Sequence, residues 1–301
     1  MNLTATPSLS ATATTQKGGV AVFGELLKLR LTLLVLLTTL VGFYVGFRGP
    51  MNYALMLHTV FATALVAGGA AALNQLLERV HDAKMRRTAG RPLPSGRLQP
   101  TAVLIYGAAC SAAGLIWLAL AVNLLTSFLG AITLVLYLFV YTPMKRVTWL
   151  NTAIGAVPGA LPPLMGWTAA RDAVSAEGWV LFAILCFWQL PHFLAIAWIY
   201  REEYAKAGFV MLPLVDAEGF RTGRQAVSHA LGLLPVSLFP FLLHLAGPVY
   251  LVSALMLGLG YLGCAVKFSR QLTLASARLL FLASILYLPL LFIVMVLDKT
   301  R

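Results

Sequence analysis

The residues best suited to chemistry lie between Asn74 and Gly96, where amide, carboxylate and basic side chains follow one another closely. Asn74, Glu78 and Asp82 are four residues apart, and on an α-helix side chains at this spacing share one face. Their oxygen atoms are the ligands that Mg²⁺ prefers, and Mg²⁺ commonly joins one or two carboxylates to the phosphates of a substrate. The spacing therefore predicts a magnesium site on one face of a helix.

Basic side chains follow this row of oxygen ligands. Arg87 and Arg91 come soon after Asp82, and Lys145 and Arg146 form a second basic pair in the stretch YTPMKR. The planar guanidinium group of Arg matches the geometry of a phosphate. A Mg²⁺-bound diphosphate needs carboxylates that bind the metal ion and, beside them, basic side chains that bind the phosphates. We therefore predict that these four basic residues bind a diphosphate. Taken alone, the second pair also fits the ordinary role of setting membrane topology.

A second acidic pair, Glu202 and Glu203, lies in the stretch WIYREEYAKAG. It follows an apolar stretch that runs in the same direction as the one before Asp82, so both acidic edges are expected on one membrane face. We predict that the pair adds ligands to the metal site from the opposite side. Two adjacent acids in a connecting segment are also common as a charged loop, and that interpretation stays open.

His192 stands inside an apolar stretch, in the sequence WQLPHF. Ionisable side chains within a membrane are energetically costly and are often functional. Three roles are compatible with its position: a ligand of a metal or of haem iron, a base, or a hydrogen bond to a helix carbonyl group that Pro191 leaves without a donor. We predict that His192 is a catalytic residue.

The rest of the chain must place these residues at a membrane. Of its 301 residues 60% are hydrophobic and 11% charged, whereas soluble domains are about 25% charged. The fifth of nine long apolar stretches contains Pro158, Pro162 and Pro163, so we expect it to be kinked or partly unwound and to border a cavity. The stretches predict an all-α bundle of about nine transmembrane helices, near residues 29–47, 53–77, 102–121, 124–142, 150–169, 178–199, 226–246, 248–266 and 277–297.

The basic residues indicate the orientation. With nine spans and a cytoplasmic N-terminus, 18 of the 22 Lys and Arg residues fall on the inner side, as the positive-inside rule requires. We therefore expect a multi-pass protein of a bacterial cytoplasmic membrane with the lipid bilayer as its surroundings. The basic residues lie in short gaps between apolar stretches, which argues against a nucleic-acid partner. We predict a disordered cytoplasmic tail over residues 1–22 and one transmembrane domain over residues 23–301.

The run from Asn74 to Gly96 resembles the first aspartate-rich motif of the UbiA superfamily of intramembrane prenyltransferases. The stretch YTPMKR is similar to a second signature of that superfamily. Within it the likeness is greatest to the branch that farnesylates protohaem IX, on the segments 151–167, 188–198 and 200–213. The resemblance covers residues 25–297. The sequence departs from the pattern where Glu78, Glu202 and Glu203 replace the usual aspartates.

The resemblance implies a helix bundle around a central apolar cavity and a Mg²⁺-dependent reaction. Farnesyl diphosphate would lose pyrophosphate, a vinyl group of haem b would attack the allylic cation, and water would add to give haem O. Haem b is then a substrate rather than a cofactor, and a downstream haem-modifying membrane enzyme is a further expected partner. The resemblance assigns Mg²⁺ and diphosphate to the acidic and basic residues described above.

Two other functions are compatible with these residues. A related prenyltransferase that acts on an aromatic or quinone precursor would use the same acids and cations. The second is a transporter of an anionic lipid or metabolite. Such a protein is expected to have broken helices in each of two repeats and polar groups near the membrane midplane. This chain has one stretch rich in proline and glycine, and its polar residues cluster at the membrane surface, which disfavours a transporter.

Overall fold

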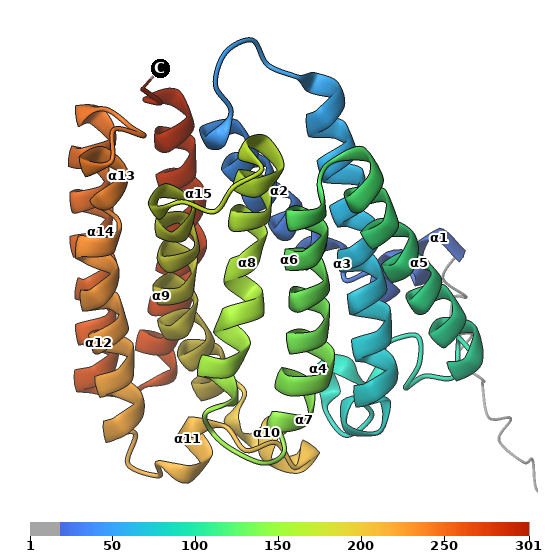
Figure 1. Ribbon diagram of the computed structural model, residues 1–301. Helices are drawn as coiled ribbons and strands as arrows, with labels where there is room; N and C mark the ends of the chain where they lie inside the picture. The colour runs from blue at the N-terminus through green and yellow to red at the C-terminus, as the bar shows by residue number, and fades with distance from the viewer. Residues whose placement is uncertain (1–18, 301) are drawn as a thin grey trace, which may run out of the picture.

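The computed structural model describes residues 19–300, in which every named element is a helix (Figure 1). One isolated β-bridge joins Ala246 to Lys299. The elements are α1 (Gly19–Leu26), α2 (Leu29–Gly46), α3 (Tyr53–Asp82), α4 (Arg86–Ala89), α5 (Pro100–Ala121), α6 (Leu124–Val135), the π-helix η1 (Leu136–Tyr141), α7 (Thr142–Met144), α8 (Asn151–Arg171), α9 (Ala176–Ile199), α10 (Arg201–Ala207), α11 (Leu212–Val215), α12 (Phe220–Val236), α13 (Phe239–Leu242), α14 (Pro248–Gln271) and α15 (Leu274–Leu297).

The long helices confirm the prediction of a multi-pass helical membrane protein. Within residues 19–300, eight helical segments are long and apolar enough to cross a bilayer. The remaining long helix, α8, has 21 residues, and 13 of them are buried in the protein. It lies between α6 and α9 with α2 behind it, so its environment is other helices more than lipid (Figure 1). Together these segments correspond to the nine spans expected from the sequence.

Of the two alternatives expected for this stretch, a kink or partial unwinding, the structure excludes unwinding, because α8 is helical from Asn151 to Arg171. Pro158, Pro162 and Pro163 each lack the amide hydrogen that would bond one turn earlier. All three prolines are buried against neighbouring helices, and proline is tolerated at membrane depth where protein surrounds it. The side chain of Gln189 on α9 donates a hydrogen bond of 2.7 Å to the Ala156 carbonyl oxygen and so connects α9 to α8.

Two glycines allow α2 and α8 to approach closely. A Cβ atom at Gly42 would collide with the backbone of Pro163, and one at Gly166 would collide with the Thr39 carbonyl oxygen. Small residues at such crossings let helix backbones meet, and in a bilayer this packing supplies much of the association energy.

We expect the substitution Gly166→Leu to lower the free energy of unfolding by about 1–3 kcal/mol, the usual cost of overpacking. The new side chain has no space between α8 and α2, so the helices must separate. Gly263→Ala on α14 is the matched control, because no atom lies within 4 Å of a Cβ placed there. The unfolding midpoint in detergent measures both effects. Equal midpoints for Gly166→Leu and the wild type would contradict the prediction.

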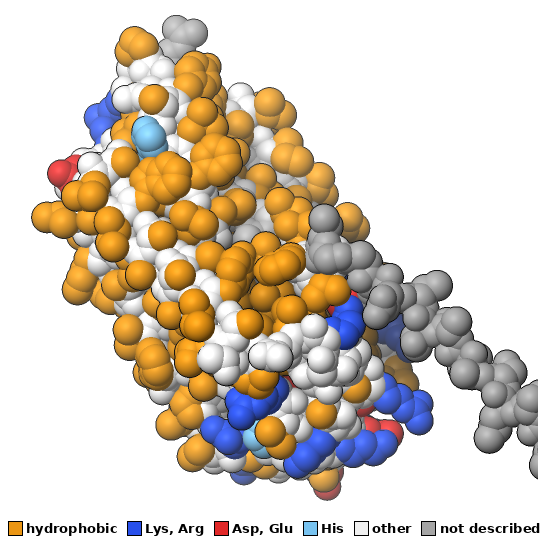
Figure 2. Space-filling view, turned by 90° about the vertical axis from the view of Figure 1, so that its right-hand side faces the viewer, with side chains coloured by type: hydrophobic (Ala, Val, Ile, Leu, Met, Phe, Trp, Pro, Cys, Tyr) orange, Lys and Arg blue, Asp and Glu red, His pale blue; other side chains and the backbone are white. Residues whose placement is uncertain are grey.

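The charged ends of the helices gather on one face of the bundle. The short helices α4, α7, α10 and α11 and their connecting segments lie at the lower end of Figure 1, and the C-terminus lies at the upper end. Figure 2 shows Lys and Arg side chains at the same lower end, below a broad apolar face. Of the predicted tail, residues 1–18 lie outside the described residues. Residues 19–22 belong to α1, so the predicted boundary at residue 22 falls inside a helix.

Candidate active site

The last turns of α3 bring Asn74, Glu78 and Asp82 onto one buried face. Their exposed fractions are 0%, 5% and 1%, although two of them carry charge. The helix continues to Asp82, five residues beyond the predicted end of this span, and so carries the three oxygen ligands in register. Buried charged groups require partners, because the loss of water is costly unless another charge or hydrogen bond replaces it.

A different cation contacts each member of this oxygen row. The Lys28 ammonium group donates to Asn74 Oδ1 at 2.6 Å, and Lys145 donates to Glu78 Oε1 at 2.7 Å. Arg91 donates to Asp82 Oδ2, also at 2.6 Å. Both carboxylate contacts are salt bridges with most of each side chain shielded from solvent. The row therefore combines hard oxygen ligands with the cations expected around a phosphate.

Asn74 is held in one orientation by the two groups that it contacts. Its Nδ2 atom donates to Thr142 Oγ1 at 2.9 Å, and Thr142 in turn donates to the Tyr137 carbonyl oxygen at 2.8 Å. The acceptor lies in η1, and the wider turns of a π-helix often mark functional sites. The Asn74 carbonyl oxygen is thus directed toward Lys28.

Lys28 stands in the turn between α1 and α2, in the left-handed conformation with φ of 47°. In the sequence Lys28 is one of the 18 basic residues that indicate orientation, and no motif around it points to a further role. Burial, with Arg91 nearby, lowers the pKa of Lys28 to about 7. The fold therefore adds a residue to the site that its position in the sequence did not reveal.

Lys145 is enclosed more completely than its place at the end of a span suggests. Its ammonium group lies 4.5 Å from the centre of the Tyr141 ring and 5.9 Å from that of Phe209. Burial by itself would lower its pKa, but the Glu78 carboxylate and the tyrosines outweigh burial and raise it. Lys145 is therefore a permanent cation at Glu78, as the predicted role in binding a diphosphate requires.

Arg87, Arg146 and the second acidic pair lie at the edge of the site. The Arg87 backbone amide donates to Glu203 Oε2 at 3.3 Å. The guanidinium carbon of Arg87 lies 5.3 Å from the centre of the Tyr200 ring. Glu202 is exposed. Within residues 19–300, no three His, Cys, Asp or Glu side chains form a group that could hold a metal ion. The structure thus does not bring the five predicted metal ligands into one cluster.

Arg146 has a different environment from its neighbour Lys145. It is exposed, and its guanidinium group lies 3.5 Å from His81 Nε2. The other ring nitrogen of His81 lies 2.8 Å from the Ala207 carbonyl oxygen, and this acceptor requires a hydrogen on Nδ1. Through His81, these contacts connect the end of α3 with α10 and with the segment after α7.

His192 lies on α9 and contacts residues of α9 and α15, none of which belongs to the oxygen row. Its ring stacks between Trp188 and Phe281, with ring centres 5.2 Å away on each side. Its Nδ1 atom lies 2.7 Å from Ser284 Oγ, and Ser284 donates its own hydrogen to the Phe281 carbonyl oxygen. Nδ1 must then be the donor to Ser284, which leaves Nε2 as the unprotonated nitrogen. The partner of His192 is the Ser284 hydroxyl group, so the third of the three roles considered, a hydrogen bond to a helix carbonyl group near Pro191, is not seen.

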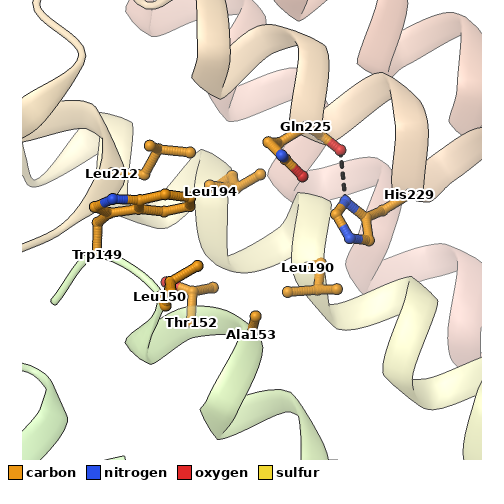
Figure 3. Close-up of a pocket in the computed structure, with 9 residues that line it drawn as sticks. All are labelled: Trp149, Leu150, Thr152, Ala153, Leu190, Leu194, Leu212, Gln225 and His229. Carbon is orange, nitrogen blue, oxygen red and sulfur yellow. Dashed lines mark hydrogen bonds between the residues drawn. The ribbon is translucent and has the colours of Figure 1, made fainter.

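Neither of two pockets on the protein is lined by the oxygen row. One lies between α8, α9 and α12 and is shown in Figure 3. Its walls are mainly apolar, with Trp149, Leu190 and Leu194 among them. On one side the Nδ1 atom of His229 donates to the Gln225 carbonyl oxygen at 2.7 Å. The other pocket lies between α3 and α5.

The oxygen row fits a Mg²⁺ ion that arrives with a phosphate ligand. The row supplies one amide and two carboxylate oxygens on a single helix face. Mg²⁺ requires six oxygen ligands and usually keeps several waters, with one or two carboxylates and substrate phosphates completing the set. The number and type of side chains on α3 are therefore those of a Mg²⁺-phosphate site, without a contribution from the second acidic pair.

The chain matches a known protein family over most of its length. The model of the UbiA prenyltransferase family matches residues 35–294. A protoheme IX farnesyltransferase of Solibacter usitatus is 50% identical over 284 residues, which cover 91% of this chain and 97% of that protein. A protoheme IX farnesyltransferase of Myxococcus xanthus is 45% identical over 277 residues, covering 91% and 93%.

Solved structures show the same fold at low sequence identity. The structure of a digeranylgeranylglyceryl phosphate synthase has a TM-score of 0.78 at 15% identity and covers 93% of this chain and 98% of that one. A UbiA homologue from Archaeoglobus fulgidus bound to DMAPP and Mg²⁺ has a TM-score of 0.68 at 18% identity, covering 91% and 98%. The family model, the relatives and the fold agree, and the chain belongs to the UbiA prenyltransferase family.

Proposed function

We propose that this protein transfers the farnesyl group of farnesyl diphosphate to a vinyl group of haem b and so forms haem O. The observation that carries the chemistry is the buried row of Asn74, Glu78 and Asp82, in which each side chain contacts one basic side chain. The identity of the acceptor is supported by relatives of up to 50% identity that are named protoheme IX farnesyltransferase.

The row and its cations would bind and activate the diphosphate. Asn74, Glu78 and Asp82 would hold Mg²⁺, which when bound neutralises the negative charge that develops on the leaving diphosphate. Lys145 and Arg91, both within hydrogen-bond distance of the row, would donate to phosphate oxygens. Groups that are fixed before the reaction stabilise transition-state charge without the cost of reorganising solvent.

The residues at the edge would complete the diphosphate site. Arg87 and Arg146 lie on the charged face near α10 and would contact the outer phosphate oxygens. Glu202 and Glu203, in the first turn of α10, would form the second edge of the site. The contact between Glu203 and the Arg87 amide supports this role, because it joins the loop after α3 to α10.

His192 would act on the haem side of the reaction. Its unprotonated Nε2 atom can contact the haem iron or accept a proton from the water that adds to the vinyl carbon. The aromatic rings of Trp188 and Phe281 fix the plane of the imidazole. The surrounding apolar side chains of α9 and α15 would keep other water away from the reactive cation.

We expect His192→Phe to preserve folding, because the new ring can take the same stacked position, but to change the absorption of bound haem b. A Soret band that shifts on substitution would indicate that Nε2 ligates the iron. Turnover that falls with an unchanged Soret band would indicate the proton-accepting role. Haem binding and turnover that both match the wild type would contradict any role for His192.

We propose further that the protein lies in the bacterial cytoplasmic membrane with its N-terminus and its charged face inside. The gathering of basic residues at one end of the bundle supports this orientation. Farnesyl diphosphate and Mg²⁺ would then reach the site from the cytoplasm. A membrane enzyme that modifies haem O would receive the product.

An assay on isolated membranes tests the function. Membranes that contain the protein should convert haem b and farnesyl diphosphate to haem O, identified by chromatography and mass. Removal of divalent cations with EDTA should stop the reaction, and excess Mg²⁺ should restore it. Prenylation of 4-hydroxybenzoate in place of haem would contradict the haem assignment but not the prenyltransferase chemistry.

A further inference from the structure

A groove on the side of the bundle carries a histidine that has no role in the proposed reaction. The groove lies between α8, α9 and α12, and the buried side chains of Leu190, Leu194 and Leu212 are among its walls. Figure 3 shows Trp149 at one end of the groove and His229 at the other, with the imidazole ring projecting from α12 toward α8 and α9. The groove therefore offers a ligand an apolar surface and one nitrogen base.

His229 has the tautomer and the backbone contact of a metal ligand. Its Nδ1 atom donates to the Gln225 carbonyl oxygen at 2.7 Å, so Nε2 carries a lone pair and no hydrogen. Histidines that bind metal ions commonly donate their other ring N–H to a backbone carbonyl group in this way, which fixes the tautomer. The Phe187 ring lies beside the imidazole, with 6.1 Å between ring centres. Nε2 is thus held ready to accept an electrophile.

The absence of further ligands indicates what kind of metal centre fits. Within residues 19–300, His229 belongs to no group of three His, Cys, Asp or Glu side chains that could hold a metal ion. A free ion would therefore find a single protein ligand in the groove. The iron of a porphyrin already has four nitrogen ligands and is commonly held by one axial histidine. The groove suits a metalloporphyrin better than a free ion.

The charge around the groove matches the propionates of a haem. Arg221, Gln225 and His229 recur every four residues, so they follow one another along one side of α12. Arg221 is exposed in the first turn, where α12 follows α11 at the charged end of the bundle (Figure 1). It lies about 12 Å from His229 along the helix axis, at 1.5 Å per residue. A ligand with its centre at Nε2 and carboxylates toward the charged end meets a guanidinium group there.

His229 and His192 lie on opposite sides of α9. Leu190 and Leu194 are two residues before and after His192, which places them roughly 160° away from it around the helix axis. His192 faces α15, where it contacts Ser284 and Phe281, whereas the two leucines face the groove. The groove is therefore separate from the place at which His192 would act.

We propose that this groove is a docking site for haem, in which His229 Nε2 is an axial ligand of the iron and Arg221 pairs with a propionate. The porphyrin ring lies against Trp149 and the leucines. Leu150 at the rim is 45% exposed, so the outer edge of the ring faces lipid. The chemistry of the groove identifies the ligand; that the docked haem is the one later farnesylated rests on the proposed function.

Titration of the purified protein in detergent with ferric haem b tests the site. The Soret band and the number of haems bound per protein are measured for the wild type and for His229→Ala. We expect the variant to lose one equivalent of bound haem, with affinity at that site at least about tenfold lower, because loss of an outer partner of a metal-binding histidine already costs roughly 10–100-fold. Added imidazole should restore the binding and the Soret band, because it supplies the missing nitrogen ligand.

Two further variants separate specific docking from partition of haem into the micelle. His244→Asn removes an exposed histidine near the opposite end of the bundle, and its φ of 55° suits Asn, so this variant should bind haem as the wild type does. Arg221→Gln should weaken the binding of haem b but not that of its dimethyl ester, which has no propionate charge.

The outcomes distinguish this inference from the proposed function. An unchanged stoichiometry and Soret band in His229→Ala would overturn the docking site, whatever the protein does with farnesyl diphosphate. Equal losses in His229→Ala and His244→Asn would do the same. Equal effects of Arg221→Gln on haem b and on its ester would overturn the propionate contact. If one equivalent depends on His229 but membranes form no haem O, the docking site stands and only the proposed function fails.

Discussion

Asp82→Asn is expected to slow farnesyl transfer by at least about 100-fold, the loss typical when one group that stabilises transition-state charge is removed. Asp82 is 1% exposed, and one of its oxygens lies 2.6 Å from Arg91. Asn keeps the size of the side chain and one hydrogen-bond acceptor but removes the negative charge that a Mg²⁺ ligand supplies. The rate of haem O formation in isolated membranes, at saturating farnesyl diphosphate and haem b, measures the effect.

The control for this variant is Asp172→Asn. Asp172 caps α8 at the opposite end of the molecule, is exposed, and has a φ of 53°, a conformation that Asn tolerates well. The rate of this variant should equal that of the wild type. If a folded Asp82→Asn protein keeps more than a tenth of the wild-type rate, Asp82 is not a ligand of the catalytic metal.

Lys145→Met is expected to lower the free energy of unfolding by about 3–5 kcal/mol, the cost of leaving one partner of a buried ion pair alone. Glu78 is 5% exposed and pairs with Lys145 at 2.7 Å, so the substitution leaves its carboxylate buried without this ion-pair partner. Farnesyl transfer should also be lost, because Lys145 is the cation closest to Glu78. Reversible unfolding in mixed micelles measures the stability.

The double variant Glu78→Gln with Lys145→Met separates the two effects. Removal of both charges should restore at least about 2 kcal/mol relative to the sum of the single variants, since no isolated charge remains buried. Activity should stay lost, because the site then lacks both a metal ligand and a diphosphate ligand. Strictly additive losses of stability would show that Glu78 and Lys145 do not interact.

The sequence by itself determined the architecture and the chemical nature of the site. Apolar stretches of about 20 residues identified the spans, because a bilayer accepts few other segments. The positions of Lys and Arg indicated one charged face, which the arrangement of α4, α7, α10 and α11 confirms. The spacing of Asn74, Glu78 and Asp82 was sufficient to predict a common face, because the period of a helix is the same in any fold.

Helix α8 shows where local sequence was insufficient. Its three prolines predicted a kink or partial unwinding, since each removes a backbone hydrogen bond. The helix persists because α2 and α9 surround it, with Gly42 and Gly166 allowing α2 to approach. The stability of a helix with missing hydrogen bonds depends on the helices packed around it. The local sequence does not specify which helices these are.

Only the tertiary structure decided which groups meet at the site. Lys28 reaches Asn74 because the turn between α1 and α2 packs beside α3, and no spacing rule connects residues 46 positions apart. His192 finds Ser284 on α15, 92 positions away, and thereby acquires a fixed tautomer. Glu203 of the second acidic pair accepts a hydrogen bond from the Arg87 backbone amide, a contact between residues 116 positions apart that no spacing rule predicts. Residue types set what chemistry is available, whereas the packing of distant helices determines which oxygen receives which cation.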